Sequence, residues 1–248
     1  MTHPPTSAGA STARARLALA VAASLALLGC PKKNKPPPVE RVWLGEARSC
    51  ARLVTGELRC QGDGSTGALG PTSAGAPHGP VTLQVDGVVL AVEHSQGALC
   101  VVLEGRAPTC RGLASKAEPA PPAGCRLERG RTVTCAGPRW PEPVTFDGAG
   151  PVAEVAEGRR HACARLENGT VLCWGQNDRG QLASPPPRGS RAPVPVQGIY
   201  GATSLVAAGD GTCAVLVDKS VRCWGDNASE RLAVGHGPIL DVPTPVHF

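Results

Sequence analysis

Aromatic residues are scarce in this sequence: four Trp, two Phe and one Tyr make up 3% of its 248 residues. A hydrophobic core must therefore consist largely of Val, Leu and Ala, whose smaller side chains each bury less apolar area. A sustained 3.6-residue hydrophobic period is also missing after the N-terminus, whereas Gly (31) and Pro (25) are abundant. Poor helix signals and rich turn signals predict an all-β fold.

The chain lacks an excess of positive charge once its N-terminal segment is set aside. The net charge is +5, but six of the 25 basic residues and one of the 20 acidic residues lie in residues 1–41, which leaves 19 of each in residues 42–248. Nucleic-acid binding requires clustered basic residues. We therefore expect no nucleic-acid partner.

The only long apolar run, residues 17–28 (LALAVAASLALL), is too short to cross a bilayer. Twelve residues rise about 18 Å as a helix, against about 30 Å of hydrocarbon. Arg14 and Arg16 precede the run, which gives it the layout of a secretory signal peptide. The run ends in LLGC, which resembles the lipobox of bacterial lipoproteins and implies cleavage before Cys30 and lipidation of Cys30. An ordinary signal peptide with an incidental cysteine is the alternative.

The segment after Cys30 predicts an extended, proline-rich linker (PKKNKPPPVER). Its three lysines would lie near anionic headgroups, or would simply keep an exposed stalk soluble. With Pro31 rather than an acidic residue after the cysteine, the resemblance to lipoproteins implies an exported protein, anchored to the outer membrane or cell surface rather than to the inner membrane. We expect three parts: a signal peptide (1–29), the lipidated Cys30 with its linker (30–41), and a repeat domain (42–248).

The remaining ten cysteines form five pairs with nine residues between the members of each: Cys50/Cys60, Cys100/Cys110, Cys125/Cys135, Cys163/Cys173 and Cys213/Cys223. If residues n and n+10 face each other across a β-hairpin, residues n+3 and n+7 do too, which leaves a three-residue loop. Such loops typically end in a left-handed residue, which glycine fills best. Residues opposed in this way lie close enough for a disulfide. The spacing therefore predicts five local disulfides.

The loop sequences fit this hairpin to different degrees. Two loops end in glycine, at Gly56 and Gly169, and two have it one position early, at Gly105 and Gly130. The loop of residues 217–219 (VDK) has no glycine. Structural zinc is the main alternative, but the usual cysteine pairs two to four residues apart are absent, as is a C-x-x-C redox motif. Reduced core thiols are the other alternative.

The cysteine pairs belong to a longer repeat, because the second cysteine is followed by any residue and then Gly in all five units. The fullest copy, residues 158–182, reads GRRHACARLENGTVLCWGQNDRGQL. It resembles the regulator-of-chromosome-condensation repeat, in which a Gly-x-x-His strand, a Gly turn and a Trp-Gly-x-Asn-x-x-Gly-Gln-Leu segment recur in each blade of a β-propeller. The paired cysteines match the exported bacterial branch of that family.

The resemblance implies structural roles for the repeat-motif residues, in preference to catalysis by the histidine or ligand stacking by the tryptophans. These residues are His161, Trp174, Gly175, Asn177, Gly180, Gln181, Trp224, Gly225 and Asn227. In the first unit, Gln61 replaces the tryptophan.

The repeat spacing predicts a β-propeller of about five degenerate repeats, each centred on a disulfide-bridged hairpin. Only fifteen positions separate Cys110 from Cys125, so one repeat is truncated there. The domain begins in mid-repeat at Val42, and residues 242–248 resemble residues 193–196 (PVPV), which we interpret as an opening strand. We therefore expect the last strand to complete the first blade and close the ring.

Recognisable patterns of catalytic, cofactor-binding or metal-binding residues are missing from the sequence. His94 has no obvious partner, and the Gly-rich residues 62–67 lack the lysine and the following helix of a phosphate-binding loop. We expect no cofactor or metal, and a monomeric, noncatalytic interaction scaffold in the cell envelope that binds a protein or an envelope polymer. The alternative is an envelope hydrolase or transferase with its active site at the propeller mouth. Nucleotide exchange on a small GTPase, the activity of the eukaryotic prototype, does not follow from a shared fold.

Overall fold

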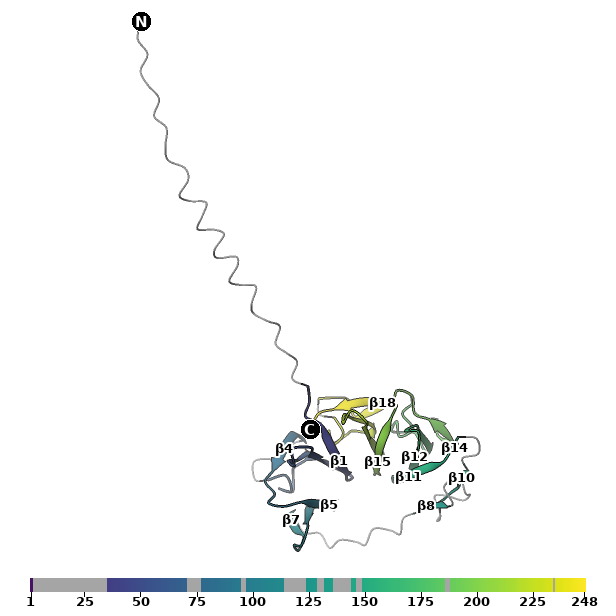
Figure 1. The fold of residues 1–248 in the computed structure, drawn as a ribbon, viewed down its shortest axis with the longest axis horizontal. Coiled ribbons are helices and arrows are strands. Elements are labelled where there is room, and N and C mark those ends of the chain that lie inside the picture. The colour runs from purple at the N-terminus through teal and green to yellow at the C-terminus, as the bar shows by residue number, and fades with distance from the viewer. Residues whose placement is uncertain are drawn as a thin grey trace. The chain divides into compact units, whose positions relative to one another are not determined.

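The computed structural model describes residues 1, 35–70, 77–94, 97–113, 124–128, 132–135, 144–145, 149–185, 188–233 and 235–248. The chain divides into two compact units, Met1–Lys35 and Pro36–Phe248. Apart from Met1, the predicted signal peptide lies outside the described residues, as does Cys30. Every helix or strand of the described part is a β-strand (Figure 1), which confirms the all-β class. Among these residues, no helix is long and apolar enough to cross a membrane.

The described residues contain eighteen strands, which form five antiparallel sheets, the blades of the propeller. Blade 1 contains β1 (Val39–Leu44), β2 (Arg48–Leu53), β3 (Leu58–Asp63) and β4 (Pro77–Leu83). Blade 2 contains β5 (Val89–His94), β6 (Ala98–Leu103) and β7 (Thr109–Gly112), and blade 3 contains β8 (Cys125–Glu128), β9 (Thr132–Cys135) and β10 (Val144–Thr145). Blade 4 contains β11 (Val152–Glu157), β12 (His161–Leu166), β13 (Val171–Gly175) and β14 (Ser190–Pro195). Blade 5 contains β15 (Ala202–Ala208), β16 (Gly211–Leu216), β17 (Val221–Asp226) and β18 (Ile239–Val246).

The predicted truncation falls between blades 2 and 3. Among the described residues, blade 2 has no strand after β7 and blade 3 has none before β8, so each is three-stranded. The predicted start of the repeat domain is slightly late, because β1 begins at Val39, inside the segment assigned to the linker. Val39 pairs with Leu53 as Val152 pairs with Leu166, so the first blade has a complete opening strand.

The predicted cysteine pairing is confirmed in all five blades. In each, the two cysteines lie directly opposite each other on the strands that form the hairpin. The disulfides are Cys50–Cys60, Cys100–Cys110, Cys125–Cys135, Cys163–Cys173 and Cys213–Cys223. Five disulfides indicate an oxidising compartment, because cytosolic reductants keep thiols reduced.

Three hairpins have the predicted three-residue loop, including the one without glycine. In blade 1, the Leu53 amide donates to Glu57 O and Gly56 has a positive φ of 89°. Blade 4 repeats this geometry at Gly169 (φ 81°). Blade 5 also repeats it, with Lys219 at φ 65° in the left-handed position. The register of the disulfide-bonded strands therefore imposes this conformation on a residue that ordinarily avoids it.

The expected exchange of the last strand into the first blade is wrong. Strand β18 pairs with β17 inside blade 5, and β1 pairs with β2 inside blade 1. The resemblance between residues 242–246 and residues 193–196 is real, but most of the latter belong to β14, the fourth strand of blade 4. Fourth strands are sheet edges, where proline is tolerated because its missing N–H faces away from the sheet. The Pro-Val pattern therefore marks closing strands, not opening ones.

The first and last blades nevertheless lie side by side. Strand β1 contacts β15 and β16, while blade 5 also contacts blade 4 and blade 1 also contacts blade 2. The Val39 amide donates to Lys219 O (2.9 Å), and Arg59 of β3 donates to the main-chain oxygen of Phe248 (3.1 Å). The contact between the first and last blades therefore depends on side chains and turns, without a shared strand.

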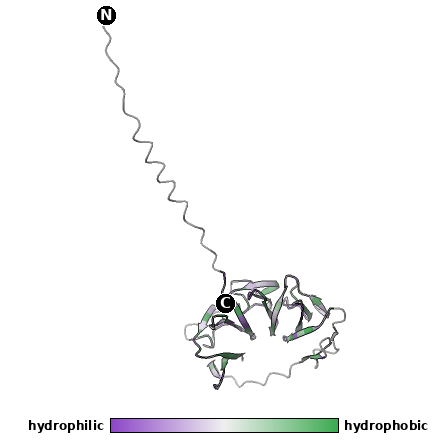
Figure 2. Ribbon diagram, in the orientation of Figure 1, coloured by the Kyte–Doolittle hydropathy of each residue, from purple (hydrophilic) through white to green (hydrophobic). Residues whose placement is uncertain are grey.

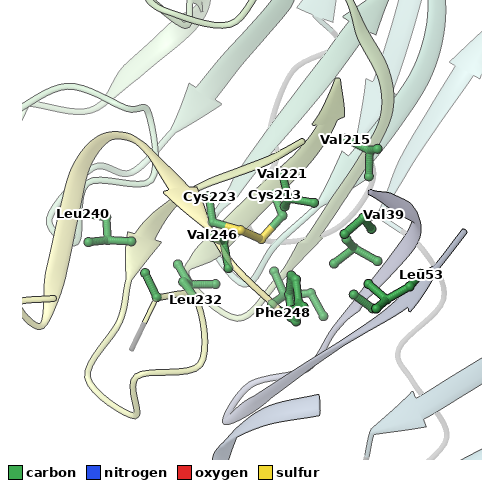
Figure 3. Packing of buried hydrophobic residues seen from close by; sticks show 14 residues of the cluster. Val39, Leu53, Cys213, Val215, Val221, Cys223, Leu232, Leu240, Val246 and Phe248 are labelled. Atoms are coloured by element: carbon green, nitrogen blue, oxygen red, sulfur yellow. A yellow bond between two sulfur atoms is a disulfide. The ribbon is translucent and has the colours of Figure 1, made fainter. Parts of the chain in front are cut away.

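The hydrophobic core lies largely between neighbouring blades, as small clusters of aliphatic residues and disulfides. Figure 2 shows hydrophobic stretches on many of the strands. Between blades 5 and 1, the Cys213–Cys223 disulfide lies among Val39, Leu53, Val215 and Phe248 (Figure 3). Phe248 is buried there, so the chain's few aromatic residues include one at this junction.

We predict that Lys219→Gly stabilises the protein. A left-handed Lys costs about 1–2 kcal/mol in backbone energy relative to a relaxed conformation. Glycine relieves this cost, while its greater freedom in the unfolded chain offsets part of the gain. The expected net gain is about 0.5–1 kcal/mol in the free energy of unfolding, measured by chemical denaturation with all disulfides intact.

Gly56→Ala is the matched control, because Gly56 occupies the same loop position in blade 1. A Cβ there would meet nothing within 4 Å, so the change tests backbone conformation without a clash. It should destabilise the protein by about 1 kcal/mol. A loss of stability in Lys219→Gly would contradict the conformational explanation.

Candidate functional site

In blades 1, 2, 4 and 5 the two ends of the sheet are formed by different connections. At the end that we call the hairpin-turn end, the second and third strands, which carry the disulfide, are joined. At the other end, which we call the loop end, the first and second strands are joined. Loops 45–47, 158–160 and 209–210 belong to blades 1, 4 and 5 and lie at the loop end.

These three loops converge at one place. The Arg159 amide of blade 4 donates to Gly209 O of blade 5. The Arg159 guanidinium forms an ion pair with Glu46 of blade 1, with Nη2 and Oε1 at 2.8 Å. The pKa of Arg159 is raised because Glu46 accepts its hydrogen bond. The three loops together form a candidate site that we call the loop cluster.

Further arginine–carboxylate pairs surround the loop cluster. Arg160 contacts Asp178 at 3.0 Å and Asp210 at 3.7 Å. Gln181 donates to both of these carboxylates. Partial burial opposes ionisation of Asp178, but Gln181 and Arg160 hold its pKa below the usual value. A carboxylate with a lowered pKa stays ionised near neutral pH, which suits ionic recognition better than proton donation.

His161 lies beneath the loop cluster and has no exposed surface. Its Nε2 forms a hydrogen bond with the Thr212 hydroxyl of blade 5, at 2.7 Å. A Cβ on Gly158 would overlap the imidazole ring and also approach Gly209 O at 2.6 Å, which explains the Gly-x-x-His spacing of the repeat. Burial lowers the pKa of His161 to about 4, so the ring is neutral near pH 7.

His94 occupies a comparable buried place between blades 1 and 2, against Gly45. Both ring nitrogens are buried without a hydrogen-bond partner in the described part of the chain. Burial, together with the nearby positive charges of Arg48 and Arg231, lowers its pKa to about 4. Neither of these two histidines can therefore act on an external substrate as the structure stands.

The predicted tryptophan positions face the interfaces between blades. Trp174 and Trp224 are both buried, and Trp224 Nε1 donates to the main-chain oxygen of Gln181 in blade 4 (3.0 Å). Gln61 occupies the equivalent position in blade 1, and its Nε2 donates to Leu232 O of blade 5 (3.0 Å). The substitution of tryptophan by glutamine therefore preserves a buried donor between blades.

The remaining motif residues shape the loop that follows the third strand. Asn177 Oδ1 accepts from the Leu182 amide, and Asn227 Oδ1 accepts from the Leu232 amide. Three glycines of the motif have positive φ, namely Gly175 (109°), Gly180 (76°) and Gly225 (102°). Gly130 lies outside the described residues, as does Cys30.

Arg231 is an important residue that the sequence analysis missed. It is fully buried between blades 5 and 1, where its guanidinium donates to Gly45 O and to Ala208 O. Its own carbonyl accepts from the Ser49 hydroxyl. A signal was present, because Arg231 aligns with the motif residue Gln181 when the two repeats are superimposed on Asn177 and Asn227.

The chemistry of the loop cluster therefore favours recognition over catalysis. Its carboxylates lie beside arginines, its histidine is neutral and enclosed, and Arg159 and Glu46 keep about half of their side-chain surface exposed (52% and 60%). Within the described residues, no group of three or more His, Cys, Asp or Glu side chains could hold a metal ion. The charged side chains of such a surface can leave their internal ion pairs and form ion pairs with a partner.

We predict that acid weakens the fold before the carboxylates titrate. An unfolded histidine ionises near pH 6.5, whereas His94 and His161 do so near 4 in the folded chain. The unfolded state therefore binds more protons between these values, so stability is full above pH 6.5 and is lost as the pH falls toward 4. Replacing His161 by Gln should reduce the slope of unfolding free energy against pH by up to about 1.4 kcal/mol per pH unit.

Denaturant titrations between pH 6.5 and 5 measure this slope, whatever the absolute stability of the variant. His94→Gln is the parallel variant and should reduce the slope in the same direction. An unchanged slope in both variants would show that these histidines titrate normally in the folded protein.

Comparison with known protein families identifies a repeat in part of the chain. A model of the regulator of chromosome condensation (RCC1) repeat matches residues 152–181, and a second model of this repeat matches residues 168–216. Among solved structures, Prp20p of Saccharomyces cerevisiae, a protein that binds Gsp1p and histones, is 14% identical over 85% of this chain and 50% of its own (TM-score 0.41). Human WBSCR16 is 19% identical over 86% of this chain and 55% of its own (TM-score 0.40).

The ectodomain of the Arabidopsis thaliana receptor kinase ACR4 is 18% identical over 76% of this chain and 72% of its own (TM-score 0.33). The chain spans about half the length of Prp20p and WBSCR16. The repeat matches coincide with blade 4 and the start of blade 5, where the Gly-x-x-His and Trp-Gly-x-Asn segments occupy the positions described above. Residues 152–216 therefore contain regulator of chromosome condensation (RCC1) repeats.

Proposed function

We propose that this protein is a lipid-tethered, noncatalytic interaction scaffold of the cell envelope, and that the loop cluster contacts a protein or an envelope polymer. The observation that carries the proposal is the convergence of loops from three blades on partly exposed arginine–carboxylate pairs, above an enclosed neutral histidine. Propeller loops supported by rigid sheets are suitable positions for recognition. The five disulfides agree with an exported protein.

The tether is proposed at Cys30, from the short apolar run and the LLGC sequence that follow the N-terminal arginines. One acyl chain anchors a protein only marginally, whereas two or more give stable attachment. Cys30→Ser expressed in a bacterial host should leave the protein in the soluble fraction and abolish labelling by a radioactive lipid precursor. Labelling that persists in the variant would contradict lipidation at this residue.

The scaffold role predicts that the loop cluster selects the partner. In cross-linking pull-downs from intact envelopes, the partner captured by the unaltered protein should be lost when Arg159 and Arg160 are both replaced by Ala. Arg106→Ala is the matched control, because Arg106 is as exposed (57%) but lies at the hairpin-turn end. Melting temperatures should confirm that both variants are folded.

Equal capture by all three proteins would show that the partner binds elsewhere. A hydrolase or transferase activity that disappears on changing His161 or one acidic residue of the loop cluster would contradict a noncatalytic role. Each result is distinct from the outcome for Cys30, so the tether and the binding face are tested separately.

A further inference from the structure

Exposed apolar side chains are concentrated at the hairpin-turn end, opposite the loop cluster. Large hydrophobic residues with about half or more of their surface exposed include five at this end: Val54 (56%), Val88 (52%), Leu90 (48%), Tyr200 (77%) and Val217 (71%). They belong to blades 5, 1 and 2, which contact one another in that order. We call these five residues the apolar end patch.

Main-chain hydrogen bonds fix the backbone at several residues of this patch. The Val54 amide donates to Pro38 O (3.0 Å), and the Val217 amide donates to Gly201 O, next to Tyr200 (2.9 Å). Val88 O accepts from the Glu104 amide in blade 2 in the same way (3.0 Å). The same bond recurs in each of these blades, so the patch is built on rigid parts of the fold.

The chain enters the folded unit at this same end. Pro36 is the first residue of the unit, and Pro38 is bonded to the turn that carries Val54. Cys30 lies eight positions before Pro38 in the sequence. A chain of that length spans at most about 28 Å when fully extended. A lipid on Cys30 would therefore keep the hairpin-turn end within a short distance of the bilayer.

Charges of both signs lie near the patch, because Asp86, Glu104 and Asp218 are exposed at this end together with two lysines. Lys219 is exposed beside Val217, and Lys35 is exposed at the entry of the chain. Glu40 is paired with Arg52 (2.7 Å) and Glu57 with Arg59 (2.9 Å), so two carboxylates at this end are already neutralised. Lysines beside apolar side chains suit the interface between headgroups and acyl chains.

We infer that the apolar end patch rests on the membrane surface to which the protein is tethered, so that the loop cluster faces away from the bilayer. This inference rests on the proposed lipid tether at Cys30. It assigns the hairpin-turn end to a lipid partner and the loop end to the partner of the scaffold.

The test uses the full lipidated protein reconstituted into phosphatidylcholine–phosphatidylglycerol vesicles. Tryptophan is introduced at Val217 in one variant and at Leu113 in the other, after which the fluorescence of the parent protein is subtracted. Leu113 is the matched control, because it is equally exposed (70%) but follows β7 at the loop end of blade 2. Lipids that carry a nitroxide near the headgroup should quench Val217→Trp at least several-fold more strongly than Leu113→Trp.

Three results would overturn the inference, and each has a different meaning. Equal quenching of the two variants would show that the hairpin-turn end does not face the bilayer. Shielding of Val217→Trp from aqueous acrylamide without nitroxide quenching, together with cross-linked dimers, would show that a second copy covers the patch. Failure of the protein to float with vesicles would overturn the tether itself and, with it, this inference.

Discussion

The contact between neighbouring blades depends on main-chain carbonyl groups that are buried at the interface and need donors from the next blade. Gln181 O and Leu232 O are such groups, and they accept from Trp224 and Gln61 respectively. A buried carbonyl left without a partner costs about 1–3 kcal/mol. Both donors, Gln61 and Trp224, directly follow a disulfide-bonded cysteine. The disulfide inside one blade therefore also positions the side chain that donates a hydrogen bond to the neighbouring blade. In a core with few aromatic residues, this polar contact complements small aliphatic clusters.

The same interfaces explain the unusual burial of ionisable groups. His161 and Arg231 have no exposed surface, yet each bonds to a neighbouring blade, through the Thr212 hydroxyl and through Gly45 O. Burial disfavours the charged form of a histidine, while an arginine stays ionised and needs acceptors. The histidine therefore remains neutral, and Nη1 of the arginine donates to two main-chain oxygens. These groups are structural parts of the interface even though they lie below the loop cluster.

Much of the fold could be predicted from the sequence, because a fixed ten-residue cysteine spacing determines hairpin register directly. The left-handed Lys219 followed from that register, although its own residue type argued against it. The fate of residues 242–246 could not be predicted, since opening and closing strands of a repeat share alternating Val, and only the pairing partner distinguishes them. The motif residues of the site were recognised, but the convergence of loops 45–47, 158–160 and 209–210 was not. It joins residues more than a hundred positions apart, such as Glu46 and Arg159, and only the arrangement of the blades brings them together.

The disulfides also determine how the chain can be oxidised as it is made. Each of the ten disulfide-bonded cysteines pairs with one that is ten positions away, and none of the five bonds joins two sheets. Because a chain emerges from its N-terminus, Cys50 meets Cys60 before any later pair is available, and the same order applies down the chain. Correct bonds can therefore form one hairpin at a time, without a search among distant thiols and without an isomerase to exchange them. Assembly of the blades is left as the later, noncovalent step, in which finished hairpins dock against one another.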